Sequence, residues 1–213
     1  MNIQDIKTYV KGATVAVAFL FGTSIITNEG LPPQQPNGNY AHYLDPIGIT
    51  TICYGYVPKS NEKVKKEYTQ KECDILLYKT IEEYSVVLKG LPALPLSTTV
   101  GFLDFGYNAG IGAANKSTIK KKLILKDLDG ASKAVLDWRF VSKKKITQSD
   151  KSKGKWVFKN DKYYYDCSQF NNGKPNKLCY GLYTRRLMEA ELIKGTMTNP
   201  DDIEKFIKQY YWK

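Results

Sequence analysis

The sequence contains very little histidine and few cysteines. His42 is the only histidine among 213 residues, and none of the four cysteines stand in a C-x-x-C spacing. Protein zinc sites are built from histidine, cysteine and carboxylate ligands, often at such short spacings. We therefore predict no metal site and no cofactor, and the single histidine argues against a histidine-based zinc site and against zinc-dependent amidases.

Long runs that are both uncharged and largely apolar are also missing, with one exception, the uncharged run at residues 12–28, GATVAVAFLFGTSIITN, which Lys7 and Lys11 precede. A membrane-spanning helix needs about 20 apolar residues, so this run is marginal. It is consistent with a cleaved signal peptide with a small-residue site at 22–24, a weak signal anchor that later leaves the bilayer, or a buried helix of a soluble protein. The marginal hydrophobicity favours the anchor, and the first two interpretations both imply export.

Acidic residues are outnumbered, with 32 Lys and Arg against 21 Asp and Glu, so the net charge is +11. Such a charge attracts polyanions, both nucleic acids and anionic cell envelopes. Because the lysines are spread along the whole chain, we predict no dedicated nucleic-acid partner. The length fits one domain, or one domain of two lobes.

The four cysteines are Cys53, Cys73, Cys167 and Cys179. An even number suits disulfides in an oxidising compartment, although three connectivities are possible. The sequential pairing Cys53–Cys73 and Cys167–Cys179 closes the shortest loops, and we favour it. Four reduced thiols are the alternative if the protein is not exported.

The chain predicts a small β-containing lobe and a larger helical lobe, joined by a long helix. A Pro- and Gly-rich loop over 31–39 precedes a short hairpin or small sheet within 47–56. The capping-box pattern Thr69-x-x-Glu72 opens a helix to about residue 88. Ser97 or Thr98 is the expected cap of the next helix, and a loop over 108–112 follows it. Further helices are expected at 117–125, 131–138, 184–194 and 201–211, the last capped by Asn199-Pro200.

Residues 142–180, the basic insertion, differ from their surroundings. A lysine-rich stretch, KKKITQSDKSKGK, precedes two short aromatic strands around a turn at Asn160-Asp161. We favour a solvated insertion stapled by Cys167 and Cys179, because charge runs usually mark solvated faces. The alternative is an accessory surface whose lysines grip anionic wall polymer, while Trp156 and the tyrosines stack on sugars.

Three residues that follow the uncharged run form a candidate catalytic set: Glu29, Asp45 and Thr51. Glycoside hydrolysis commonly uses two carboxyl groups, one protonated to assist the leaving group and one ionised. Glu29 suits the acid, Asp45 the charged partner, and the Thr51 hydroxyl could hold the attacking water. Spacing alone is weak evidence, since most surface carboxylates only provide solubility.

The wider pattern is more specific. Asp45-x-x-Gly48-x-x-Thr51-x-Cys53-x-Gly55, preceded by Glu29-Gly30, closely resembles the phage lysozyme family, glycoside hydrolase family 24. Three later blocks resemble that family in the same order, namely residues 68–73 (YTQKEC), 105–110 (FGYNAG) and 181–189 (GLYTRRLME). The spacing from Glu29 to Asp45 is longer than the family's usual one, and the extra residues lie in the Pro-rich loop.

The resemblance implies an α+β, lysozyme-like fold and an endolysin, a muramidase that cleaves the β-1,4 bond between N-acetylmuramic acid and N-acetylglucosamine. Glu29 would be the general acid, and Asp45 and Thr51 would position water in an inverting reaction. Asn108 and Gly110 would line the cleft. Either Arg185 or Arg186 would lie beside the acid, and we prefer Arg186.

The resemblance also implies a location and a domain plan. Residues 1–28 would be a signal anchor or signal peptide, and 29–213 the lysozyme domain. Within it, 29–90 would form the small lobe and connecting helix, and 91–213 the helical lobe with the basic insertion. The protein would be exported by the host secretion pathway, tethered to the inner membrane and then released into the periplasm as a monomer that acts on peptidoglycan.

Three alternatives compete with this function. The first is a non-catalytic, membrane-tethered protein that binds cell-wall glycan, which would not need an acid, a carboxylate and a hydroxyl in register. The second is a lytic transglycosylase, which would not need to position water. A nucleic-acid binder comes third, and the export segment argues against it.

Overall fold

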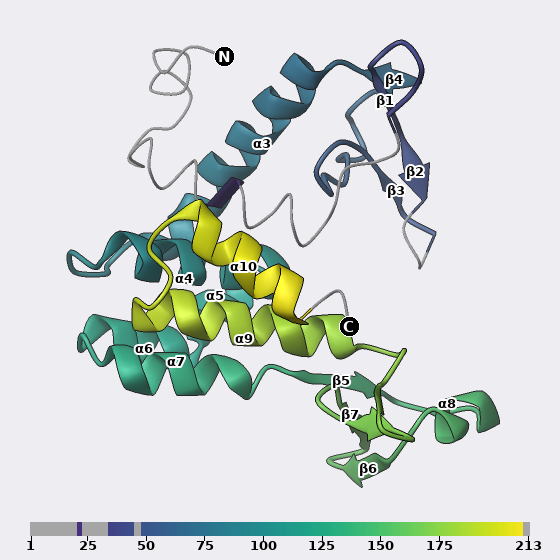
Figure 1. The fold of residues 1–213 in the computed structure, drawn as a ribbon, viewed down its shortest axis with the longest axis vertical. Coiled ribbons are helices and arrows are strands. Elements are labelled where there is room, and N and C mark those ends of the chain that lie inside the picture. Colours follow the sequence, from purple (N-terminus) through teal and green to yellow (C-terminus); the bar gives the residue numbers. More distant parts are fainter. Residues whose placement is uncertain (1–20, 23–33, 45–47, 211–213) are drawn as a thin grey trace.

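The computed structural model of the chain describes residues 21–22, 34–44 and 48–210. Glu29, Asp45 and most of the uncharged run 12–28 therefore lie outside the described residues. In the part of the chain that is described, no helix is both long and apolar enough to cross a membrane. The arrangement of helices and small sheets confirms the α+β class (Figure 1), whereas the domain boundaries stay a prediction.

The described part of the small lobe contains four two-residue strands, β1 (Tyr40–Ala41), β2 (Tyr43–Leu44), β3 (Thr50–Thr51) and β4 (Glu67–Tyr68). β1 pairs with β4 and β2 with β3, both antiparallel. The prediction of a hairpin within 47–56 was wrong in its first strand, because β3 pairs with residues 43–44. Only an isolated bridge joins Ile52 to Tyr56. Gly48, with φ of 85°, supplies a conformation in the β2–β3 connection that other residues rarely adopt.

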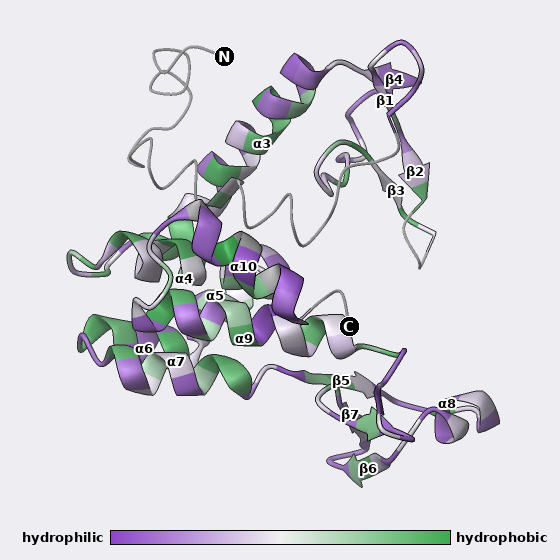
Figure 2. Ribbon diagram, viewed as in Figure 1, coloured by the Kyte–Doolittle hydropathy of each residue, from purple (hydrophilic) through white to green (hydrophobic). Residues whose placement is uncertain are grey.

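The connecting helix forms as predicted. α3 spans Gln70–Tyr84, and the 3₁₀ helix η1 (Ser85–Leu88) continues it. The capping box is present, since Thr69 Oγ1 accepts from the Glu72 backbone N–H at 3.3 Å and the Glu72 carboxylate accepts from the Thr69 N–H at 2.9 Å. Hydrophilic and hydrophobic residues alternate around α3 (Figure 2), as expected of a helix that buries one side.

The helical lobe consists of α4 (Leu96–Ala109), α5 (Ile111–Lys116), α6 (Thr118–Ile124), α7 (Leu128–Leu136), α9 (Tyr180–Lys194) and α10 (Pro200–Tyr210). α4 packs against α9, which also packs against α7. Gly101 permits the α4–α9 contact, because a Cβ atom there would lie 2.8 Å from Leu192 Cβ. The two helices that carry the 105–110 and 181–189 motifs are thereby held in close contact.

Several predicted helix boundaries were wrong by a few residues. α4 begins before Ser97 and Thr98, and the Thr98 hydroxyl donates to the Ile193 carbonyl at 2.9 Å instead of capping. The predicted loop 108–112 shrinks to Gly110 between α4 and α5. The Thr98 hydroxyl thus bonds to the neighbouring helix α9 and not to its own helix, which the local sequence pattern could not predict.

Most of the remaining boundaries follow from local caps. Asp127 accepts from the Gly130 N–H at 2.8 Å, so α7 begins earlier than predicted. Ser117 caps α6, whose predicted range began at that residue. Asn199 accepts from the Asp202 N–H at 3.1 Å at the start of α10, as predicted. α9 begins at 180 instead of 184; its N-cap residue Cys179 makes no side-chain capping hydrogen bond and is bonded to Cys167.

The basic insertion forms a small unit that projects away from the helices (Figure 1). It contains the three-stranded sheet β5–β7–β6, the short helix α8 and the β8–β9 pair, with bounds Phe140–Lys143 (β5), Gln148–Ser152 (α8), Trp156–Lys159 (β6), Lys162–Asp166 (β7), Phe170–Asn171 (β8) and Lys174–Pro175 (β9). The predicted hairpin is confirmed. Asn160 and Asp161 both have positive φ, as a two-residue hairpin turn requires. The sequence did not predict β5 or α8.

Both disulfides follow the sequential pairing that we favoured. Cys53–Cys73 ties the segment after β3 to α3, and Cys167–Cys179 ties the end of β7 to the start of α9. The second disulfide staples the basic insertion to the helical lobe at its C-terminal end.

Candidate active site

Thr51 is the described member of the predicted catalytic set. It ends β3 opposite Tyr43 and is 4% exposed. Its hydroxyl donates to the Ile49 carbonyl at 3.1 Å. The hydroxyl hydrogen is therefore used in a hydrogen bond to the backbone, and the oxygen still has lone pairs that can accept a hydrogen bond.

The chain just beyond Thr51 is fixed to α3. Cys53 adopts φ of 51° and is bonded to Cys73. The Tyr54 hydroxyl donates to the Asp74 carboxylate at 3.1 Å. Burial raises the pKa of Tyr54 to about 12, so this phenol remains a donor at neutral pH. A covalent and a polar contact on consecutive residues thus hold Thr51 at a defined position relative to α3.

Across from the small lobe, α4 and α9 bring together Asn108 and Arg186. Arg186 is 1% exposed, and its guanidinium donates to the Asn108 side-chain oxygen. The same guanidinium lies 2.9 Å from a Glu189 carboxylate oxygen and 5.2 Å from the centroid of Phe105. Of the predicted cleft residues, the structure therefore joins Asn108 and Arg186 directly.

Arg185 is directed elsewhere. Its guanidinium contacts the buried Asp104 carboxylate at 3.0 Å and 3.2 Å and lies 5.7 Å from the Tyr107 ring centroid. The Tyr107 hydroxyl donates to the Gly55 carbonyl at 3.3 Å, so this tyrosine connects the two lobes. The two neighbouring arginines diverge because successive residues of a helix point about 100° apart.

Gly110, the third predicted cleft residue, separates α4 from α5 with φ of 88°. No heavy atom lies within 4 Å of the position a Cβ would take. Glycine is thus required here by the backbone conformation and not by crowding. The turn places Asn108 at the exposed end of α4.

Sequence analysis missed three residues of this cluster: Asp104, Tyr107 and Glu189. The signal for Asp104 is a single acidic residue in an otherwise uncharged helix, LSTTVGFLDFGYNA. Glu189 ended the quoted 181–189 motif, but its spacing to Arg185 and Arg186 was not used. Residues three and four apart on a helix lie on one face, which is where both ion pairs form.

Comparison with known proteins decides the family. The sequence profile described as phage lysozyme matches residues 35–154, more than half of the chain. The chain belongs to the phage lysozyme family. The matched part includes Asp45 and Thr51, begins after Glu29, and ends inside the basic insertion.

Individual relatives agree with this membership. The chain is 29% identical to a SAR-endolysin of bacteriophage PS34 over 137 residues, covering 63% of this chain and 79% of the relative. It is 29% identical to a SAR-endolysin of bacteriophage PS119 over 145 residues, covering 66% and 83%. An endolysin from Escherichia coli O157:H7 phage FAHEc1 has the same fold, with a TM-score of 0.59 at 20% identity over 89% of this chain and 97% of that one. The lysozyme-like fold is thereby confirmed, and membership supports a peptidoglycan-degrading enzyme.

Glu189 is a buried carboxyl whose pKa is shifted by its surroundings. Burial raises the pKa of the Glu189 carboxyl well above its usual range, the Arg186 guanidinium opposes the shift, and the nearby Asp104 carboxylate adds to it. Glu189 thus tends to keep its proton where an exposed glutamate would lose it.

Replacing Glu189 by glutamine is expected to be close to neutral at about pH 4, and to become stabilising relative to wild type as the pH rises above the usual glutamate pKa of about 4.3. In that window the folded wild type holds a proton that the unfolded chain has released, so wild-type stability falls with pH. Glutamine does not titrate, and the difference should grow by up to about 1.4 kcal/mol per pH unit. Urea unfolding across this pH range measures it, with Glu82→Gln on an exposed face as the control. A difference that does not vary with pH would contradict the assignment.

Proposed function

We propose that this chain is a muramidase, which hydrolyses the β-1,4 bond between N-acetylmuramic acid and N-acetylglucosamine in peptidoglycan. The observation that carries the proposal is the family match over residues 35–154, which includes Asp45 and Thr51. The fixed position of Thr51 and the Asn108–Arg186 contact on the facing helices support it. The chain acts as a phage endolysin that lyses the host cell.

In the proposed reaction, Glu29 gives its proton to the leaving oxygen, and Asp45 and Thr51 position the attacking water. Because the Thr51 hydroxyl hydrogen is directed to the Ile49 carbonyl, Thr51 offers the water an acceptor. A water that donates one hydrogen to Thr51 and the other to the Asp45 carboxylate has its lone pair turned to the sugar. A single displacement of this kind inverts the anomeric carbon.

Arg186 is the arginine that we place beside Glu29. The support for this choice is that its guanidinium donates to Asn108 at the exposed end of α4. Asn108 and Gly110 form the proposed edge of the cleft, since one is exposed and the other borders open space.

We further propose that the chain is exported, tethered to the inner membrane by its N-terminal segment, and released intact into the periplasm. The support is Phe21, which is fully buried and whose ring packs edge-on to Tyr107 at 6.3 Å. A Cβ at Gly22 would lie 3.3 Å from Leu77 of α3, so the segment also contacts the connecting helix. Cleavage at residues 22–24 would remove Phe21 from this core. Residues embedded in lipid cannot pack there, which makes the tethered and the folded forms mutually exclusive.

The chemistry is tested by incubating purified peptidoglycan sacculi with the intact protein, oxidised and free of detergent. We expect clearing with release of new reducing ends on N-acetylmuramic acid, formed first as the α-anomer. Products that end in 1,6-anhydro-muramic acid would replace the proposal by a lytic transglycosylase. Binding to sacculi without any cleavage would replace it by a non-catalytic glycan-binding protein.

A further inference from the structure

The basic insertion accounts for most of the net charge of the molecule, although lysines occur along the whole chain. Residues 142–180 contain ten lysines and three aspartates, which is a net charge of +7 out of +11 for the chain. All ten lysines are exposed. Among the described residues, Lys143 is the one of the ten that makes an ion pair, with Asp150. Nine ammonium groups are therefore available to an anionic partner.

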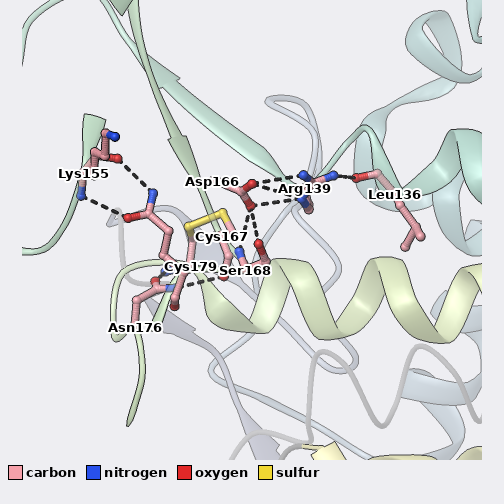
Figure 3. A network of polar contacts seen from close by, with 9 residues as sticks. Leu136, Arg139, Lys155, Asp166, Cys167, Ser168, Asn176 and Cys179 are labelled. Atoms are coloured by element: carbon pink, nitrogen blue, oxygen red, sulfur yellow. Dashed lines mark hydrogen bonds and ion pairs between the residues drawn. A yellow bond between two sulfur atoms is a disulfide. The ribbon is translucent and has the colours of Figure 1, made fainter. Parts of the chain in front are cut away.

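The base of the insertion is rigidly attached. Figure 3 shows the Asp166 carboxylate accepting from Arg139 at 3.0 Å beside the Cys167–Cys179 disulfide. Asn176 donates to the Cys167 carbonyl at 2.7 Å. These contacts connect β7 to the segments before β5 and before α9. The end of β7 is therefore anchored next to the helical lobe.

Two of the aromatic residues that the alternative interpretation assigned to sugar stacking, Trp156 and Tyr165, contact each other within the insertion. Tyr165 is fully buried, and its ring lies 5.1 Å from Trp156. The Trp156 indole N–H donates to the Asp150 carbonyl at 2.9 Å, and Lys143 lies over its ring. Trp156 and Tyr165 thus pack against each other within the insertion, and sugar stacking by the half-buried rings stays a prediction.

Two apolar side chains remain exposed near the end of the hairpin. Val157 is 54% and Phe158 58% exposed. As neighbours on a strand they point to opposite faces of the sheet. Lys159 and Lys162 follow at once, on either side of the turn. The hydrophobic residues of β6 are visible at the far end of the insertion in Figure 2.

One face of the hairpin carries four rings, those of Trp156, Phe158, Tyr163 and Tyr165. Tyr165 is buried and Trp156 and Tyr163 are half-buried, so Phe158 is the exposed ring of this face. Here apolar groups lie on both faces of a narrow hairpin end, with lysines around them. Long lysine side chains can keep their charge in a polar layer while the apolar residues beside them enter a less polar one. The interface of an anionic bilayer has both layers.

We propose that the β6–β7 hairpin inserts end-on into the headgroup region of an anionic phospholipid bilayer. Val157 and Phe158 enter the boundary with the acyl chains, and Lys159 and Lys162 contact lipid phosphates. The remaining lysines of the basic insertion add long-range attraction to the surface. This contact is separate from the N-terminal segment and goes beyond the proposed catalysis, because none of these residues belongs to the candidate active site.

The test measures co-sedimentation of the full chain with phosphatidylcholine vesicles that contain or lack phosphatidylglycerol. The N-terminal segment has the same sequence in every variant, so its contribution cancels in the comparison. Wild type should partition at least tenfold more strongly onto the anionic vesicles, and this preference should fall as salt is added. The double variant V157T/F158T should lose about tenfold of the anionic binding, since the replacements keep strand propensity but remove apolar contact.

A matched control comes from another exposed apolar pair close to lysines, Ile124 and Leu125, which are 49% and 75% exposed. I124T/L125T should bind within about twofold of wild type, as expected for residues that do not touch the bilayer. Equal losses in both double variants, or none in V157T/F158T, would overturn the proposal. A V157T/F158T variant that loses binding to purified sacculi but not to vesicles would also overturn it, in favour of a wall-polymer surface. Cleavage of sacculi by V157T/F158T should match wild type, so failure of this inference is distinguishable from failure of the muramidase proposal.

Discussion

Replacing Glu29 by glutamine is expected to lower the rate of reducing-end release from peptidoglycan about a thousandfold. Glutamine has nearly the same shape and can still donate a hydrogen bond, but it cannot transfer a proton to the leaving oxygen. The remaining activity would come from the binding of the glycan and the positioning of water by Asp45 and Thr51. The measurement is the initial rate of reducing-end formation on purified sacculi at saturating substrate.

The control for this substitution is Glu82→Gln, the same chemical change on an exposed face of α3. It should leave the rate within about twofold of wild type, as surface changes away from a site usually do. Both variants should show the wild-type far-UV circular dichroism spectrum and the same urea midpoint. A Glu29→Gln enzyme that works at the wild-type rate would remove Glu29 from the mechanism, and another acid would have to be sought.

Replacing Phe21 by alanine is expected to lower the free energy of unfolding of the released protein by about 3–5 kcal/mol. Phe21 is fully buried in the main core and lies edge-on to Tyr107. Its removal takes an aromatic ring out of a close-packed site that the backbone of α3 and α4 cannot collapse to fill. Urea unfolding with both disulfides intact measures the change.

Phe158→Ala is the matched control, because it is the same substitution at a residue that is 58% exposed. Its expected cost is below about 0.5 kcal/mol. If Phe21→Ala lowers the free energy of unfolding as little as Phe158→Ala does, the Phe21 side chain does not stabilise the folded enzyme. That result would favour cleavage of residues 1–28 as a signal peptide over release of the intact segment from the membrane.

A large cost at Phe21 would also bear on catalysis. Tyr107, which Phe21 contacts, donates to the Gly55 carbonyl of the small lobe and packs under the Arg185 guanidinium. Loss of Phe21 therefore removes support from the residue that joins the two lobes. We expect Phe21→Ala to reduce activity even at temperatures where it remains folded, since small displacements between catalytic groups are costly.

The features that the sequence alone determined are those decided by neighbours in the chain. Thr69 and Glu72 lie three residues apart, so the capping box of α3 forms from their own backbone and side chains. Asn160-Asp161 adopts the turn that its residue types favour, and the hairpin follows. The sequential disulfides close short loops of 20 and 12 residues. The motif order was also enough to predict the family, which the profile match confirms.

Only the tertiary structure decided which groups meet across long separations. The Thr98 hydroxyl donates a hydrogen bond to the Ile193 carbonyl instead of capping α4. The adjacent residues Arg185 and Arg186 donate to different side chains, Asp104 and Asn108. A residue pattern cannot express these outcomes, because each depends on the α4–α9 packing that Gly101 allows. The same holds for Phe21, whose apolar character is equally suited to lipid and to a protein core. Phe21 is buried against Tyr107, a ring 86 residues further along the chain, and no local sequence pattern predicts that contact.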